Sequence, residues 1–224
     1  MSDDNRGPGE ALPRAEQRWT ASAFVLVAMT IPFLLPARYA AGDAWLLPTV
    51  EGIVLLTLIV VDPGRIDRPG RWVRALSIGL VVAIAAGAAW AAGRLVWDLL
   101  HGNPQTEAAD QLLVAGALVW LQTVIAFAFL YWELDGGGAV NRHLHPAEHP
   151  DVAFPQQLEP RLAAPDWRPV FFDYLYLALT NATAFSPTDV MPLSRRAKLA
   201  MASQSLLSIV ILSLVVANAV NLLD

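Results

Sequence analysis

The stretch that decides the fold is Phe171–Asp189, which reads FFDYLYLALTNATAFSPTD and precedes a long apolar run from about Ala197 to Leu223. Its first half is too apolar for a loop. Its second half, with Thr, Asn, Ser, Pro and Asp, is too polar to face lipid. Such residues at membrane depth are tolerated only inside protein or beside water. The stretch therefore predicts a re-entrant helix, which enters a membrane and returns on the same side.

The composition predicts one all-α membrane domain. The chain has 224 residues, is 55% hydrophobic and has a mean hydropathy of +0.45. Its apolar residues gather in runs of about 18 to 28, the length a helix needs to cross roughly 30 Å of hydrocarbon. The absence of cysteine excludes disulfides and thiolate chemistry. One lysine and no basic stretch with interleaved aromatics argue against nucleic-acid binding.

The apolar runs predict five transmembrane helices plus the re-entrant pore-type helix, with spans at about 21–40, 44–61, 72–100, 112–132 and 197–223. They divide the chain into a polar cytoplasmic tail (1–20), a four-helix membrane region (21–133), a Pro/His-rich loop (134–168), and the re-entrant helix with the last span (169–224). The alternative is six spans, in which residues 169–186 cross fully. The re-entrant form is favoured because Thr180, Asn181 and Thr183 would otherwise face hydrocarbon.

Charged residues predict the orientation of the chain. Arginines gather in the N-terminal tail and in the loop near residue 68, whereas the next loop has none. The positive-inside bias therefore places the N-terminus in the cytoplasm of a bacterial inner membrane, in a multi-pass protein. The first twenty residues lack the pattern of a signal peptide, so the first span is expected to be retained. Aromatic residues at the predicted span edges indicate interface positions: Trp19, Trp45, Trp72, Trp97, Tyr131, Trp132 and Trp167.

The second half of the chain resembles a family of uncharacterised bacterial integral membrane proteins. The residues that carry this likeness are DYLYLALTNATAFSPTDVMPLSRRAKL at 173–199, the ending AVNLL at 219–223, LYWELDGGG at 130–138 and AFPQ at 153–156. The first half follows the family mainly in its layout of spans. The resemblance implies a multi-pass membrane fold and brings no established activity.

The C-terminal third is also similar to the pore module of two-helix cation channels: a span, a linker, a short pore helix, a polar strand with Asp and Pro, and a last span. A potassium-type filter needs glycines to turn its carbonyls toward the ion. Here TAFSPTD at 183–189 is one residue longer, and no glycine follows Gly138. The predicted orientation also makes the segment enter from the cytoplasmic side, opposite to that module. A wider constriction of hydroxyl, amide and carboxylate oxygens is the form that this resemblance implies.

The candidate functional residues are polar groups expected at membrane depth. Those expected to line a pore are Thr180, Asn181, Thr183, Ser186, Thr188 and Asp189. Interhelical hydrogen bonding is the alternative for the first three, and a plain turn is the alternative for 186–189. Glu51, inside the second span, is the candidate intramembrane acid. Asp173 is expected to favour the start of its helix, and Arg94 with Asp98 to form a local ion pair.

Three functions remain open on this sequence. The leading one is an oligomeric, pore-loop-like ion channel, a homo-oligomer in the lipid bilayer that passes an inorganic cation. A non-conducting helical scaffold or accessory subunit is the second, and a proton-coupled carrier that uses Glu51 is the third. No nucleophile motif, phosphate loop or paired carboxylate with a base predicts an enzyme. No cofactor is predicted, and no metal site is predicted at the loop histidines His143, His145 and His149.

Overall fold

Helices account for nearly all of the regular structure. A computed structural model describes residues 16, 18–61, 70–101, 109–144, 149–159, 161, 163–164, 167–184 and 189–221. The elements, in chain order, are α1 (Arg18–Leu34), η1 (Ala37–Tyr39), α2 (Leu46–Val61), α3 (Arg71–His101), α4 (Ala109–Leu134), η3 (Asp135–Gly137), α5 (Ala139–Leu144), β1 (Val152–Ala153), α6 (Pro155–Leu158), α7 (Phe171–Ala184), β2 (Met191–Pro192) and α8 (Arg195–Asn221).

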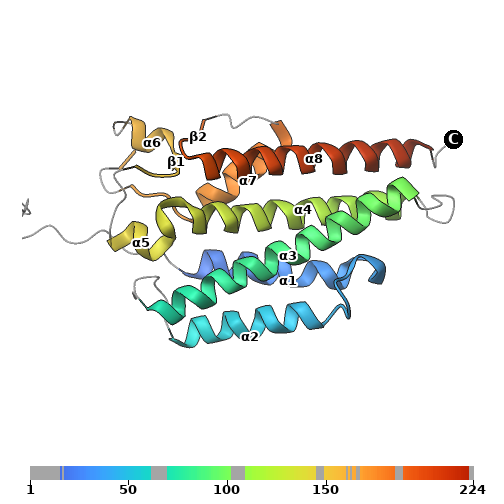
Figure 1. Cartoon of the computed structure of the whole chain (residues 1–224), viewed down its shortest axis with the longest axis horizontal. Coiled ribbons are helices and arrows are strands. Elements are labelled where there is room, and N and C mark those ends of the chain that lie inside the picture. The colour runs from blue at the N-terminus through green and yellow to red at the C-terminus, as the bar shows by residue number, and fades with distance from the viewer. Residues whose placement is uncertain are drawn as a thin grey trace, which may run out of the picture.

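The helix α4 lies at the centre of the bundle. It packs against α3 on one side and against α7 and α8 on the other, and it also contacts α1. The helix α2 packs on α1 and α3, at the edge farthest from α8 (Figure 1). This order brings the last third of the chain against α4. The surroundings of the α7 polar residues are therefore set by α4 and α8.

Small residues allow the close approach of α2 and α3. Ala88, Ala91 and Ala92 of α3 are buried. At Gly87 an added Cβ would lie 2.5 Å from Cδ2 of Leu47 on α2, so a larger residue there would require the end of the Leu47 side chain to move. Small residues at a contact of this kind let two helices approach closely.

The coarse prediction of a nearly all-α protein with membrane-spanning helices is confirmed. Within the described residues, three helical segments are long and apolar enough to cross a membrane: Arg71–His101, Asp110–Leu144 and Arg195–Val220. The helices Arg18–Leu34 and Leu46–Val61 are apolar but shorter. The larger number of spans, five or six, stays a prediction.

The two ends of the bundle differ in charge. At one end α1, α3 and α8 begin and α4 ends, and it carries Arg18, Arg71, Arg74, Arg142, Arg195 and Arg196. We call it the basic end. At the opposite end, Asp98 pairs with Arg94 at 3.5 Å and with Arg38 at 3.6 Å. The predicted Arg94–Asp98 pair is thus confirmed.

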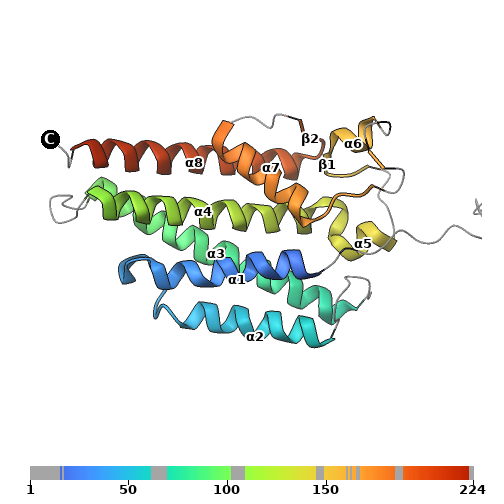
Figure 2. The ribbon, with the colours of Figure 1, turned by 180° about the vertical axis from the view of Figure 1, so that it is seen from behind.

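The helix α7 begins at the basic end, and the described chain after α7 resumes at that same end. In Figures 1 and 2, α7 starts beside α5 at the basic end and ends beside the middle of α8. The next described element, β2, pairs antiparallel with β1, with Val152 opposite Pro192 and Ala153 opposite Met191. This short sheet lies at the basic end (Figure 1).

Two of the expected interface aromatics are core residues instead. Tyr131 is 1% exposed and Trp132 7% exposed, whereas Trp19, Trp45 and Trp72 are well exposed. The difference arises because the last two turns of α4 lie beneath α7 and α8 rather than at a lipid boundary. The two side chains therefore contribute to packing.

Candidate functional site

The start of α7 is fixed by aromatic packing. Phe171 is fully buried, with its ring centroid 4.4 Å from that of Phe129, 5.6 Å from that of Phe24 and 5.9 Å from that of Trp132. Offset and edge-to-face aromatic pairs of this kind stabilise by more than their buried area alone. The first turn of α7 is therefore held on α1 and α4.

Two carboxylates accept the backbone N–H groups at this helix start. Oε1 of Glu16 accepts from the N–H of Phe171 at 2.5 Å, and Oε2 of Glu16 accepts from the indole N–H of Trp132 at 3.0 Å. Asp173 accepts from the N–H of Val170 at 2.8 Å, which is the predicted helix-start role. Burial raises the pKa of Glu16, and the bonds from Phe171 and Trp132 partly offset this.

The middle of α7 is joined to α4 and α8 by a buried polar cluster. Asn181 is 1% exposed and Gln204 is fully buried. The amide of Asn181 donates to Oε1 of Gln204 at 2.9 Å and to the carbonyl of Met201 at 3.0 Å. The hydroxyl of Tyr131 donates to the same Gln204 oxygen at 2.6 Å. One residue from each of the three helices thus meets at the amide of Gln204.

Two further hydrogen bonds join α7 to α8 in this cluster. The Gln204 amide donates to the carbonyl of Ala178 at 2.8 Å, and the hydroxyl of Ser205 lies 3.2 Å from Oδ1 of Asn181. Gln204 and Ser205 therefore make interhelical contacts of the kind that polar residues in apolar helices commonly make. We call Tyr131, Asn181, Gln204 and Ser205 the α7 anchor.

The two threonines of α7 face away from the anchor. Thr180 is half-buried and Thr183 is exposed. Their hydroxyls donate to carbonyls of their own helix, to Tyr176 at 2.9 Å and to Leu179 at 3.0 Å respectively. Hydroxyls bonded in this way lower the polarity that the helix presents to its surroundings, yet they keep oxygen atoms on its outer face.

The remaining expected pore-lining residues follow α7. Ser186 and Thr188 lie outside the described residues, and Asp189 is exposed. Asp189 lies two residues before β2, so it lies near the basic end and not beside the tip of α7. The structure thus separates the predicted set into Asn181 inside the bundle, Thr180 and Thr183 on the outer face of α7, and Asp189 beside the sheet.

Sequence reasoning missed the buried aspartate that organises the basic end. Asp135 is 1% exposed. Its carboxylate accepts from the N–H of Asp151 at 2.8 Å, from the N–H of Val152 at 3.3 Å and from the hydroxyl of Tyr174 at 2.6 Å. It therefore links the end of α4 to β1 and α7. The signal in the sequence is LDGGG, an acid beside three glycines, which belongs to the stretch that carries the family resemblance and otherwise predicted only the start of a loop.

Asp151 joins this network to α8. Its carboxylate accepts from Nε and Nη2 of Arg196 at 2.7 and 2.6 Å, a two-point contact that fixes direction as well as distance. Burial opposes ionisation of Asp151, but the bonds from Arg196, Ser194 and Gly136 outweigh it and hold its pKa below the usual value. Because Asp151 also precedes β1, this pair fixes the sheet to the first turn of α8.

The three glycines of this motif are required by backbone shape and by space. Gly136, Gly137 and Gly138 have φ of 57°, 77° and 94°. An added Cβ at Gly138 would lie 2.9 Å from the carboxylate of Glu133, and at Gly136 2.7 Å from Cγ of Arg142. Glycine adopts positive φ without a steric penalty, so this run turns the chain sharply from α4 into α5.

The candidate intramembrane acid, Glu51, is enclosed by α2 and its neighbours. It is 3% exposed. Among the described residues, no hydrogen-bond or ion-pair partner is recorded for its carboxyl group. It lies in the first half of α2, away from α7 and α8, since α2 packs on α1 and α3. Glu51 and the α7 residues are therefore two separate places in the molecule.

No family model, curated protein or solved structure matches this chain. The fold and the site therefore define the class of protein: a nearly all-α protein with helices long and apolar enough to cross a membrane, and a short helix held by a buried polar anchor.

Proposed function

We propose that this chain is a multi-pass protein of the bacterial inner membrane in which α7 is a re-entrant helix beside a cation-permeable path in a homo-oligomer. The observation that carries the proposal is the path of the chain around α7. Phe171 and β2, which flank the segment, both lie at the basic end. A segment that leaves where it entered has not crossed the bundle.

The length of α7 supports re-entry over crossing. Its 14 residues rise roughly 21 Å at 1.5 Å each, short of the roughly 30 Å of a bilayer core. The long helices α3 and α8, with 31 and 27 residues, have ample length to cross. A helix that ends near mid-depth needs protein or water at its C-terminal carbonyls. An oligomer with a hydrated axis supplies both.

The outer face of α7 supplies the chemistry of such a path. Thr180 and Thr183 place hydroxyl oxygens on this face, and Asp189 places a carboxylate near the basic end. Oxygen ligands and a ring of carboxylates favour cations. In this proposal Asn181 holds α7 in position from behind, while Thr180, Thr183 and Asp189 face the path. The lack of glycine after Gly138 argues for a wide constriction without a potassium-type filter.

Charge distribution supports the proposed orientation. The basic end holds most of the described arginines, and the positive-inside bias assigns such an end to the cytoplasm. Re-entry then takes place from the cytoplasmic side. The sequence resemblance to bacterial integral membrane proteins favours the same membrane, and it carries no activity over to this chain.

Cation flux into proteoliposomes tests the proposal. Purified protein should pass monovalent cations above the level of protein-free liposomes. Asp189→Asn should lower this flux severalfold, because a carboxylate near the mouth concentrates cations. Asp110→Asn, which neutralises an exposed acid of α4 at the opposite end, is the matched control and should leave flux unchanged. No flux above background, or equal effects of the two variants, would contradict the proposal.

The second candidate function is a non-conducting scaffold or accessory subunit. The α7 anchor favours the scaffold function, because the amide of Asn181 is hydrogen-bonded to α8 of its own chain. On this alternative, Asp189→Ala leaves liposome flux at background, and Asn181 variants lower only stability. The proton-coupled carrier would instead show pH-dependent uptake that Glu51→Gln abolishes.

A further inference from the structure

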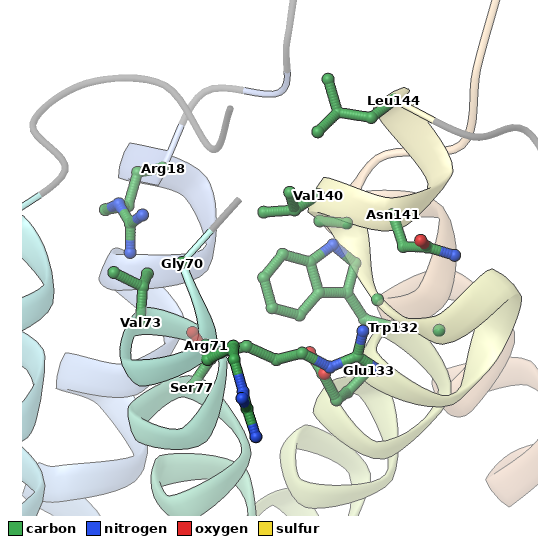
Figure 3. A pocket seen from close by; sticks show the side chains of 14 residues that line it. Arg18, Gly70, Arg71, Val73, Ser77, Trp132, Glu133, Val140, Asn141 and Leu144 are labelled. Carbon is green, nitrogen blue, oxygen red and sulfur yellow. The ribbon is translucent and has the colours of Figure 1, made fainter. Parts of the chain in front are cut away.

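A pocket opens at the basic end between α1, α3, α4 and α5. Its volume is about 250 Å³. Figure 3 shows Arg18 on the side of α1, Trp132 at the centre, and Val140, Asn141 and Leu144 on the side of α5. The pocket lies apart from α7, whose residues do not line it. It is smaller than the roughly 300–1,000 Å³ of ordinary small-molecule sites, so it suits a headgroup better than a whole ligand.

The charges in the pocket favour an anion. Arg18, Arg71 and Arg74 line it, and Glu133 is the one acid among its described lining residues. Arg74 and Glu133 interact electrostatically. Nη2 of Arg74 lies 3.6 Å from where a Cβ would stand on Gly137, so the guanidinium lies beside the glycine turn. Arg71 and Arg74 are both exposed in the first turn of α3 and can reach a ligand at the pocket mouth.

The walls of the pocket are apolar. Val73 of α3, the indole of Trp132, and Val140 and Leu144 of α5 supply them. The indole N–H of Trp132 is already bonded to Glu16, so the ring offers the pocket its apolar surface. A site with cationic groups at its mouth and hydrocarbon along its walls suits an amphiphile better than a free anion.

We propose that this pocket binds the headgroup of an anionic phospholipid, with its phosphate at Arg71 and Arg74 and the start of its acyl chains along Val73, Val140 and Leu144. The position agrees with this ligand, because the pocket lies at a level where α3 begins and α4 ends, which is headgroup depth for helices that span the bilayer. Basic pockets between transmembrane helices on the cytoplasmic side are a known form of lipid headgroup site. This inference does not depend on whether the protein conducts.

The test uses the full chain in a zwitterionic detergent and follows its thermal unfolding. Short-chain phosphatidylglycerol should raise the unfolding temperature in a saturable way, whereas phosphatidylcholine of the same chain length should not. Arg71→Gln with Arg74→Gln should weaken the phosphatidylglycerol effect about twenty-five-fold, because each arginine near an anionic lipid contributes about a factor of five. Leu144→Ser, which alters only the wall, should weaken it less and leave the charge intact.

Arg195→Gln is the matched control. It removes an exposed arginine from the same end of the molecule, on α8 and outside the pocket. It should leave phosphatidylglycerol binding unchanged. Equal losses in Arg195→Gln and in the double variant would overturn the pocket and assign the effect to general surface charge. An unfolding temperature that rises equally with inorganic phosphate alone would overturn the lipid assignment in favour of a free anion.

Discussion

The side chain of Asn181 joins α7 to α4 and α8. Its amide reaches Gln204 and Met201 on α8, and its Oδ1 lies near Ser205. A polar group buried at this depth needs partners, and these are supplied within the chain. The sequence predicted that Asn181 would lie away from lipid, either lining a pore or hydrogen-bonded to another helix. It could not show which residues protect it, because Tyr131 and Gln204 lie 50 and 23 residues away.

Replacing Asn181 by Ala should lower the free energy of unfolding by about 1–2 kcal/mol, because buried partners lose their donor. Thermal or denaturant unfolding in detergent measures this change. Thr183→Ala is the matched control on the outer face of α7, where the hydroxyl bonds only to its own helix. It should change stability by less than about 0.5 kcal/mol. Equal losses in the two variants would show that the anchor does not hold α7.

Replacing Glu51 should raise the free energy of unfolding, whereas replacing Asn181 should lower it. Its carboxyl group is buried without a recorded partner, and burying such a group costs roughly 1–3 kcal/mol in proteins. Glu51→Met, which keeps the straight chain, should therefore raise the free energy of unfolding by about that amount. Glu51→Gln keeps the polar group and should give little gain. A loss of stability in Glu51→Met would mean that the carboxyl group makes contacts that stabilise the fold.

At the scale of elements, the turn after α4 and the pair between β1 and β2 decide where α7 and α8 begin. Asp135 holds β1 and Tyr174, and Arg196 holds Asp151. The apolar runs of the sequence place the long helices to within a few residues, because each run is bounded by charged, proline or glycine residues. The network at their ends could not be foreseen, since it depends on which loop residues meet after the helices pack.

The glycine turn is tested by two substitutions of the same kind. Gly138→Ala should lower the free energy of unfolding by about 1–3 kcal/mol, because its φ of 94° disfavours any side chain and the new Cβ would meet Glu133. Gly93→Ala in α3 has open space around it and should instead raise helix stability by about 0.5–1 kcal/mol. Thermal unfolding of both variants measures the contrast. A neutral Gly138→Ala would contradict the left-handed turn.

Because of the Asp151–Arg196 pair, the free energy of unfolding should fall at acid pH. Because the folded pKa of Asp151 is below its ordinary value of 3.8, its stabilising contribution is present above that pH and is lost as the pH falls through the folded pKa. Asp151→Asn should therefore be less stable than the natural chain at pH 7. The difference should shrink below pH 3.8, as followed by unfolding at a series of pH values. A constant difference across the series would contradict the pair.

At the scale of the whole molecule, α4 lies between two groups of helices. The first three helices, with Glu51 among them, lie toward one side and α7 and α8 toward the other, and the groups also meet where α1 contacts α7 and α3 contacts α8. The nearly all-α fold was predictable because the apolar runs have membrane length. The number of spans was not, because α1 and α2, with 17 and 16 residues, lie near the lower limit for crossing.

The most direct test of the account asks on which side of the membrane each flank of α7 lies. The chain has no cysteine, so single cysteines introduced at Val170, Asp189 or Asp43, all of them exposed, can be labelled one at a time with a membrane-impermeant thiol reagent in sealed vesicles. If α7 is re-entrant, Val170→Cys and Asp189→Cys react from the same side, and Asp43→Cys, at the opposite end of the bundle, reacts from the other. Reaction of Val170→Cys and Asp189→Cys from opposite sides would show that the segment crosses, and would contradict re-entry.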